Sequence, residues 1–236
     1  MIAQPIRLLS IALAVLMAAA APAAAQRTQQ TQRAPPLQYD DLRLATIVDL
    51  EYRIDPNWSF HLDSQLKIDD DISRLRDLEV RPGFEYTFSR NWAVAAGYVQ
   101  YQRYVTGLRT QRGPFQDILY RTYFDRIEVI GRLRTEELFY EDGALLGRAR
   151  TQLGAYFPIG DLPWTFDLSD EVYFNLKVDG TGREAGVHEN KAYTGLSWHF
   201  TAGARMSVGY ELDTYDQLGQ LRNEHTFKLS FAYSLN

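Results

Sequence analysis

The sequence predicts an all-β protein, a closed antiparallel transmembrane β-barrel of about 10–12 strands. Three observations support this fold class: apolar and charged residues alternate along strand after strand, tryptophans stand where strands begin, and glycines fall on the charged side. In such a barrel we expect short turns on the periplasmic side and longer loops on the outer side.

The clearest alternation lies in a hairpin between Ile127 and Phe157, with a turn at 141–143. Successive side chains of a strand point to opposite faces, so the charged residues of each strand share one face and the apolar residues share the other. The charged face of this hairpin carries Arg132, Arg134, Glu136, Arg148 and Arg150.

The same alternation continues from Leu42 to the C-terminus, separated by turn residues such as Asp55-Pro56-Asn57. We expect loops at Val105–Gly113 and Val178–Glu189. The other candidate strands are 42–54, 58–68, 77–88, 92–101, 115–124, 164–175, 191–200, 205–213 and 227–235.

These segments make about eleven candidates, whereas bacterial single-chain barrels have an even number of strands. Two solutions remain open. Either Phe115–Phe124 lies in a loop, which gives ten strands, or the region before Leu42 contributes one, which gives twelve.

Residues 1–25 have the features of a secretory signal peptide: an early Arg7, an apolar run, and small residues at Ala23 and Ala25. The mature chain would then carry 24 basic and 30 acidic groups, because Arg7 is the only charge removed. Residues 26–40 are polar and contain paired prolines, which favours a flexible lead-in. We therefore expect export to the outer membrane, with residues 41–236 forming the barrel.

Cysteine is absent, so the exported chain has no disulfide to stabilise it. No apolar stretch of the mature chain approaches the roughly 20 residues that a spanning helix needs. The 13% content of aromatic residues suits the interfacial girdles of a membrane barrel.

A soluble periplasmic β-sandwich or lipocalin-like binding protein would show a similar alternation, with the charges turned outward. Two features favour the membrane barrel instead. Trp58, Trp92 and Trp164 begin strands directly after short turns, as an interfacial girdle requires. Small residues on the charged face suit a crowded lumen; they are Gly97, Gly154, Gly195 and Gly209.

Several motifs resemble a family of Gram-negative outer-membrane barrels that is catalogued only as a domain of unknown function. They are R-P-G at 81–83, G-Y at 97–98, R-L-R-T-E at 132–136, S-D-E-V-Y-F-N at 169–175, N-K-A-Y-T-G-L at 190–196 and G-Y at 209–210. The resemblance covers nearly the whole mature chain and implies an outer-membrane barrel, but it brings no activity. The chain departs from the family at Lys191, where Arg is more common, and at its Leu235-Asn236 end, where an aromatic residue is usual.

The inward charges form the candidate site, a lumenal ionic network. Basic residues dominate 115–157, and acidic ones the candidate strands at 77–88 and between 164 and 213, so opposed walls can set up a transverse field that orients dipolar solutes. Alternatively, the same residues pair and fill the lumen. For Arg134 we expect Glu136, Glu128 or Glu171 as partner. The network comprises Arg121, Arg132, Arg134, Glu136, Arg148, Arg150, Glu171, Glu211 and Asp213.

The enzymatic alternative is an outer-membrane lipid-modifying hydrolase. Ser197 and His199 share one strand face, and Glu211 or Asp213 could supply an acid. Ser-x-His is common by chance, so we assign no catalytic residue.

No metal or cofactor site is assigned either. His61, His188 and His225 show no metal-ligand spacing. Asp69-Asp70-Asp71 is expected to be a solvated loop rather than a cation site. Asp170 falls in the lipid-facing phase of its strand without an evident reason.

The sequence thus favours an outer-membrane β-barrel with a structural role or a narrow passage for small solutes. Expected partners are outer-membrane lipid, the barrel-assembly machinery during biogenesis and a small polar solute. No phosphate loop or basic-aromatic surface for nucleic acid is present.

Overall fold

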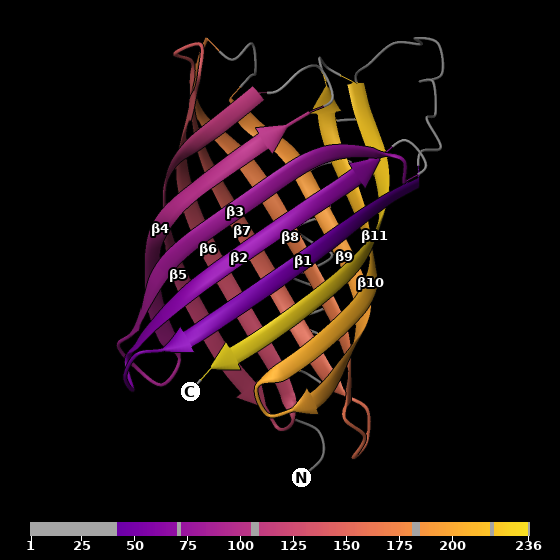
Figure 1. Ribbon diagram of the computed structural model, residues 1–236. Helices are drawn as coiled ribbons and strands as arrows, with labels where there is room; N and C mark the ends of the chain where they lie inside the picture. The colour runs from indigo at the N-terminus through magenta and orange to yellow at the C-terminus, as the bar shows by residue number, and fades with distance from the viewer. Residues whose placement is uncertain (1–41, 70–71, 105–108, 181–184, 218–219, 236) are drawn as a thin grey trace.

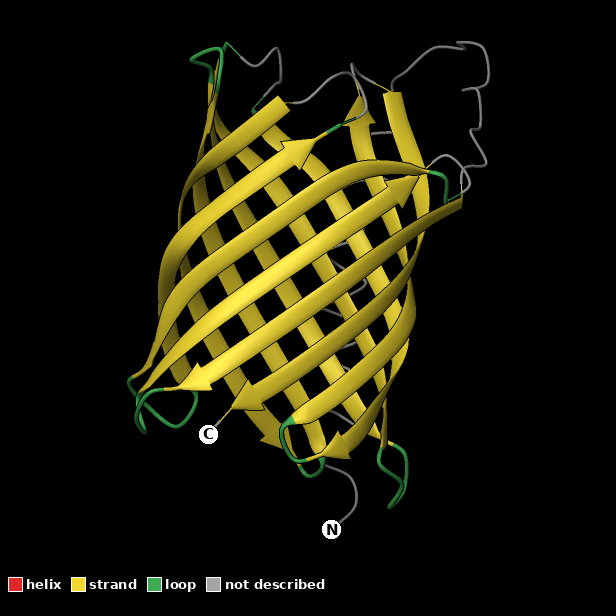
Figure 2. Cartoon of the chain, viewed as in Figure 1, coloured by secondary structure: helices red, strands yellow, loops and turns green. Residues whose placement is uncertain are grey.

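The computed structural model describes residues 42–69, 72–104, 109–180, 185–217 and 220–235. This part of the chain forms one closed barrel of tilted strands (Figures 1 and 2). No helix long and apolar enough to span a membrane occurs among these residues. The strands are β1 (Leu42–Arg53), β2 (Trp58–Asp69), β3 (Arg74–Thr87), β4 (Trp92–Arg103), β5 (Arg109–Phe124), β6 (Ile127–Tyr140), β7 (Leu145–Pro158), β8 (Trp164–Asp179), β9 (Gly186–Thr201), β10 (Ala204–Gln217) and β11 (Gln220–Leu235).

Each strand pairs antiparallel with its neighbours in the chain, and β1 closes the barrel by pairing parallel with β11. An up-and-down chain with an odd number of strands brings its first and last strand together in the same direction, which explains the parallel seam. The ten-strand solution is wrong, because Phe115–Phe124 belongs to β5. The twelve-strand solution is also wrong, because β1 already pairs with both β2 and β11 and leaves no free edge for a further strand.

The lower rim in Figure 1 joins β1–β2, β3–β4, β5–β6, β7–β8 and β9–β10 through two to five residues. The upper rim joins the other pairs through two to six residues. The upper loops are shorter than predicted, because strands continue into them. β5 already begins at Arg109, β8 runs on to Asp179, and β9 begins at Gly186.

Apolar side chains project from the outer surface, and charged side chains lie buried inside. In a soluble sandwich the apolar rows would press against each other between two sheets, so the soluble alternative is wrong and the barrel is of the transmembrane kind. Large apolar residues exposed on the outside include Phe84, Val94, Ile118, Leu133, Phe166, Leu196, Val208, Phe227 and Leu229.

An aromatic girdle surrounds the lower rim, as the strand-initial tryptophans predict. Trp58 packs against Tyr86, and Trp92 against Tyr120, with ring centroids 4.9 and 4.7 Å apart. Trp164 stacks on Trp198 at 6.0 Å. Amphipathic rings of this kind occupy the boundary between hydrocarbon and headgroups, so the girdle fixes the depth of this rim.

Inside the barrel, near the upper rim, a small apolar cluster fills the space between β4, β5, β6 and β7. It consists of Val99, Phe115, Leu138 and Leu146, each at most 4% exposed. Gly97 makes room for it, because a Cβ there would lie 2.6 Å from the Phe115 ring and 2.2 Å from the Pro82 carbonyl oxygen. The lumen is therefore packed at this level on one side.

Candidate functional site: a charged lumen

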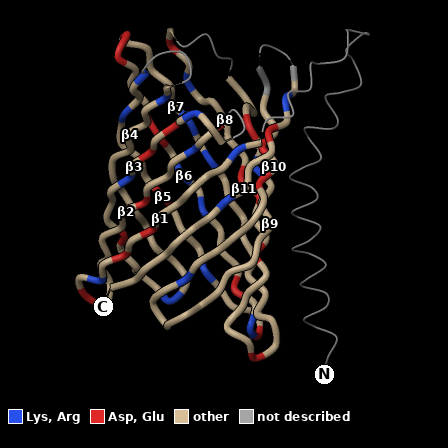
Figure 3. The backbone as a smooth tube through the Cα atoms, turned by 45° about the vertical axis from the view of Figure 1, so that its right-hand side comes forward, with Lys and Arg blue, Asp and Glu red and all other residues tan. Residues whose placement is uncertain are grey.

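Lys, Arg, Asp and Glu residues occur along the strands over most of the height of the barrel (Figure 3). Many of their side chains are buried inside it. Their densest group lies on adjacent strands β5 to β8, and we call it the ionic wall. Its members alternate with outward residues, so the period-two pattern of each strand places them on one surface. The ionic wall consists of Asp117, Arg132, Arg134, Glu136, Arg148, Arg150 and Glu171.

Glu136 is the centre of the wall, and its side chain is fully buried. Arg148 lies directly opposite it on β7 and donates through Nε at 2.8 Å. Arg150 donates to the other carboxylate oxygen at 3.1 Å. One carboxylate thus accepts from two guanidinium groups, and these charge-assisted bonds compensate the desolvation of all three charges.

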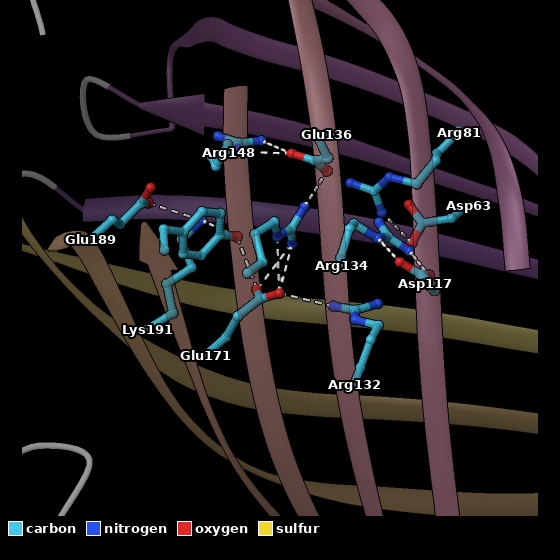
Figure 4. Close-up of polar contacts among 12 residues, drawn as sticks. Asp63, Arg81, Asp117, Arg132, Arg134, Glu136, Arg148, Glu171, Glu189 and Lys191 are labelled. Atoms are coloured by element: carbon cyan, nitrogen blue, oxygen red, sulfur yellow. Dashed lines mark hydrogen bonds and ion pairs between the residues drawn. The ribbon is translucent and has the colours of Figure 1, made fainter. Parts of the chain in front are cut away.

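Glu171 is the second centre (Figure 4). Arg150 binds both of its oxygens, with Nε and NH2 each at 3.0 Å. Arg132, on β6, reaches across β7 to Glu171 at 2.9 Å. Arg150 therefore joins Glu136 to Glu171, and the two centres form one continuous network.

Arg134 pairs with Asp117, through Nε at 2.7 Å and NH2 at 2.6 Å. The prediction of Glu136, Glu128 or Glu171 as its partner is therefore wrong. The reason is strand register, because Asp117 on β5 lies directly opposite Arg134. The guanidinium also lies over the Phe115 ring, 4.5 Å from its centroid, so the apolar cluster covers this end of the wall.

Tyr173 links the wall to β9. Its hydroxyl donates to Glu171 at 2.9 Å and accepts from Lys191 at 3.1 Å. The Lys191 ammonium lies 4.5 Å and the Arg150 guanidinium 4.6 Å from the ring centroid. Lys191 in turn pairs with Glu189 at 2.9 Å, so the network continues around the barrel.

Three predicted network residues lie outside the wall. Arg121 is largely exposed near the lower rim and pairs with Glu128 at 3.1 Å. Glu211 accepts from Lys228 on β11 at 2.7 Å. Asp213 lies 4.0 Å from Lys191. The structure thus joins Arg132, Arg134, Glu136, Arg148, Arg150 and Glu171 on one side of the barrel and leaves these three at other positions.

The inner surface of β1, β2 and β3 differs from the ionic wall, and we call it the acidic wall: Asp49, Glu51, Asp63 and Glu85. Asp49 lies directly opposite Asp63, and their carboxyl groups contact each other. Arg81 donates to Asp63 at 3.2 Å. Two of these carboxylates are more accessible than the ionic wall, since the side chain of Asp63 is 32% exposed and that of Glu85 26%, whereas Arg81 is buried.

A third cluster crosses the seam near the upper rim. Glu224 on β11 accepts from Arg76 on β3 at 2.9 Å and from Tyr215, and it forms an ion pair with Arg43. Arg76 lies 3.2 Å from Asp77, which accepts from Arg103 at 2.8 Å. This cluster therefore joins strands on both sides of the parallel seam.

Ser197 and His199 form no catalytic pair. Ser197 is fully buried, donates to Asp167 and contacts the Ser207 hydroxyl at 2.6 Å. His199 instead lies 3.3 Å from the Thr165 hydroxyl. A base that does not reach the serine cannot activate it, so the geometry gives the hydrolase alternative no support.

Sequence reasoning left several residues of the site out of the predicted network, among them Asp63, Arg81, Asp117 and Tyr173. Asp117 carries a signal, because it follows Phe115 and precedes Leu119 on the inward phase of β5. The sequence gives no signal for the role of Tyr173. Its contact with Lys191 depends on the pairing of β9 with β8, which the sequence pattern does not show. Within the described residues, no group of three or more potential ligands could hold a metal ion.

With this geometry in place, comparison with protein families gives one decisive match. A family described as "Protein of unknown function (DUF2490)" matches residues 46–223. The chain belongs to this family. The resemblance inferred from the motifs is confirmed, and DUF2490 membership brings no activity with it. Comparison with curated proteins finds no match.

Among solved structures, the chain is similar to one described as the NanC porin, with a TM-score of 0.53 and 15% identity. The match covers 83% of this chain and 99% of the porin chain. At this identity the similarity shows the fold alone, which is a porin-like barrel. The fold points to the outer membrane.

Proposed function

We propose that this DUF2490 protein is an outer-membrane barrel that passes small polar solutes through a narrow, off-centre route. The supporting observation is the unequal burial of inward charges. The Glu136 side chain is fully buried and that of Arg150 is 6% exposed, whereas that of Asp63 is 32% exposed. Water-accessible surface inside the barrel therefore lies beside β1–β3, and the packed ionic wall narrows the rest.

The charges of the two walls favour a particular kind of solute. The acidic wall carries four carboxylates, and its nearest cations include Arg81 and Arg205. The ionic wall opposite has four guanidinium groups and three carboxylates. Such walls create a field across the lumen rather than along it, which suits small dipolar or zwitterionic solutes over simple anions.

Single-channel recording in planar bilayers tests this proposal. We expect small conductance steps for the mature protein. Asp63→Asn should lower the preference for cations over anions, because it removes a carboxylate from the accessible side. Arg148→Met serves as the matched control: it removes a charge from the packed side and should leave ion selectivity almost unchanged.

Two results would contradict passage. A bilayer that stays silent with correctly folded protein would favour the purely structural alternative, in which the networks fill the lumen. Selectivity that responds to Arg148→Met but not to Asp63→Asn would place the route on the other side of the barrel.

A further inference from the structure

The outer surface of the barrel is not uniformly apolar towards the upper rim. On β1–β3, most of the upper outward positions are apolar, with two hydroxyl residues, Thr46 and Ser64, among them. The apolar residues are Leu42, Leu44, Leu66, Ile68, Leu78 and Val80. On β4–β6, most of the outward positions at this height are polar or charged, and we call them the β4–β6 polar face. It consists of Gln100, Gln102, Arg112, Gln116, Thr135 and Glu137.

Strand register shows that this change occurs at a single boundary. Val80 on β3 lies directly opposite Gln100 on β4, and Leu78 lies opposite Gln102. Gln100 is in turn opposite Arg112 on β5. Neighbouring strands are about 4.8 Å apart, so an apolar and a polar surface meet within one strand spacing at nearly the same depth.

The depth of the polar face follows from the aromatic girdle. Gln100 stands eight positions after Trp92 on β4. At about 3.3 Å per residue and a tilt of roughly 40°, it lies about 20 Å above the girdle. Gln116 lies opposite Ala96, nearer to the girdle. An apolar band is about 25 Å tall, so a bilayer of ordinary thickness would place both amides in hydrocarbon.

Few of these polar side chains have a hydrogen-bond partner within the barrel. Thr135 donates to Gln116 at 3.0 Å, and Gln102 accepts from Tyr104 at 2.8 Å. Among the described residues, exposed Arg112 and Glu137 form no ion pair. Polar groups left without partners in hydrocarbon cost several kcal/mol each, so something polar must cover this face. Asp170, also outward, differs because Asn190 donates to both of its carboxylate oxygens, at 3.0 and 3.1 Å.

The area of the face decides between a second protein and lipid. Three strands spaced by about 4.8 Å, with four or five residues of about 3.3 Å along each, give on the order of 200 Å². A stable protein interface needs about 800 Å² from each partner, so the face is too small for a second copy. A cation and an anion close together instead match the phosphate and ammonium groups of zwitterionic lipids.

We propose that lipid headgroups of the leaflet next to the upper rim descend along the β4–β6 polar face. The bilayer is then thinner against β4–β6 than against β1–β3. Hydrophobic mismatch of this kind costs fractions of a kcal/mol per Å, far less than burying the polar groups in hydrocarbon. The bilayer therefore differs in thickness between two sides of the barrel, whether or not solutes pass through its lumen.

Depth measurement with spin labels tests the proposal directly. The chain contains no cysteine, so Val80→Cys and Gln100→Cys each introduce a single labelling site. In phosphatidylethanolamine and phosphatidylglycerol vesicles, a label at position 100 should show severalfold higher accessibility to a water-soluble nickel complex, relative to oxygen, than a label at 80. The proposal is wrong if both labels are equally accessible and both are more accessible to oxygen than to the nickel complex. Shielding of position 100 from both reagents, with spin-spin broadening between copies, would show a protein partner instead.

A second measurement uses the stability of the folded barrel in vesicles of increasing acyl-chain length. Gln100→Leu/Gln116→Leu/Thr135→Val extends the apolar band on β4–β6, so the chain length of maximum stability should shift towards longer lipids. The control Thr46→Val/Ser64→Ala, on β1 and β2, changes outward hydroxyls on the taller apolar face and should leave the maximum in place. If the triple variant is most stable at the same acyl-chain length as the unmodified protein, the bilayer is not thinner against β4–β6.

Discussion

The ionic wall and the acidic wall are parts of one sheet, yet their charges are paired in opposite ways. On β5–β7, strand register places Asp117 opposite Arg134 and Glu136 opposite Arg148. On β1–β2, it places Asp49 opposite Asp63. Unlike charges directly opposite each other can be buried together, whereas like charges repel and retain contact with water. The ionic wall is packed because each of its guanidinium groups reaches a carboxylate, including Arg134 and Arg150, which lie opposite each other. On β1–β3, Asp63 lies opposite Arg81 but is also in contact with the Asp49 carboxyl group.

The largest effect is expected at the centre of the ionic wall. Glu136→Ala leaves the buried guanidinium groups of Arg148 and Arg150 without this carboxylate, which should lower the free energy of unfolding by about 3–5 kcal/mol. Urea unfolding followed by tryptophan fluorescence measures it. The matched variant on the acidic wall, Glu85→Ala, should cost far less. Equal losses would show that the two walls are packed alike.

The apolar cluster that covers Arg134 gives the next effect. Gly97→Ala places a Cβ 2.6 Å from the Phe115 ring, and the resulting shift should cost about 1–3 kcal/mol. The control is Gly131→Ala, where the nearest atom, Tyr120 Cβ, is 3.9 Å away. Heat-modified migration on gels reports both. A neutral Gly97→Ala would mean that the upper lumen is looser than the contacts indicate.

On the acidic wall, removing a charge should raise the free energy of unfolding rather than lower it. Asp49→Asn removes one of two like charges that face each other across β1 and β2, so it should stabilise the barrel by roughly 0.2–1 kcal/mol. The same unfolding assay applies, with Glu128→Gln as a control because Glu128 is paired with Arg121. Destabilisation by Asp49→Asn would show that this carboxylate has a partner of its own and that the two walls are more alike.

The smallest effect is expected at the lower rim. Arg126 pairs with Asp161 at 3.0 Å, but Asp161 is almost fully exposed. Exposed pairs contribute little, so Arg126→Ala should change the free energy of unfolding by less than about 0.5 kcal/mol. A larger loss would show that pairs outside the lumen also matter, which would weaken the contrast between the packed wall and other charged regions.

Side-chain alternation was sufficient to predict the fold and to assign residues to its two faces. Arg132, Glu136 and Arg150 all point inward as the pattern indicates, because a strand has a fixed period of two. The tryptophans likewise placed the lower rim. Turn residues marked most strand ends, although at Arg109, Asp179 and Gly186 main-chain pairing carries strands further than side-chain patterns suggest.

Pairing between strands was harder to foresee, since alternation says nothing about register. Asp117 lies within the predicted strand 115–124, but alternation did not show that it stands opposite Arg134. Ser197 and His199 share a face, but the neighbouring strand β8 supplies Asp167 to Ser197 and Thr165 to His199. Asp170 was unexplained until β9 brought Asn190 beside it. In each case the missing information is which residue lies opposite, which depends on the closed barrel as a whole.

The parallel seam has a consequence for biogenesis. Leu42 on β1 meets His225 on β11, so the closing contacts join the two ends of the barrel sequence. Until the final strand has been synthesised and docked, β1 and the growing edge both present unpaired amide and carbonyl groups that can template aggregation. The main-chain hydrogen bonding of both edges is therefore completed only when β11, the last strand in the sequence, pairs with β1.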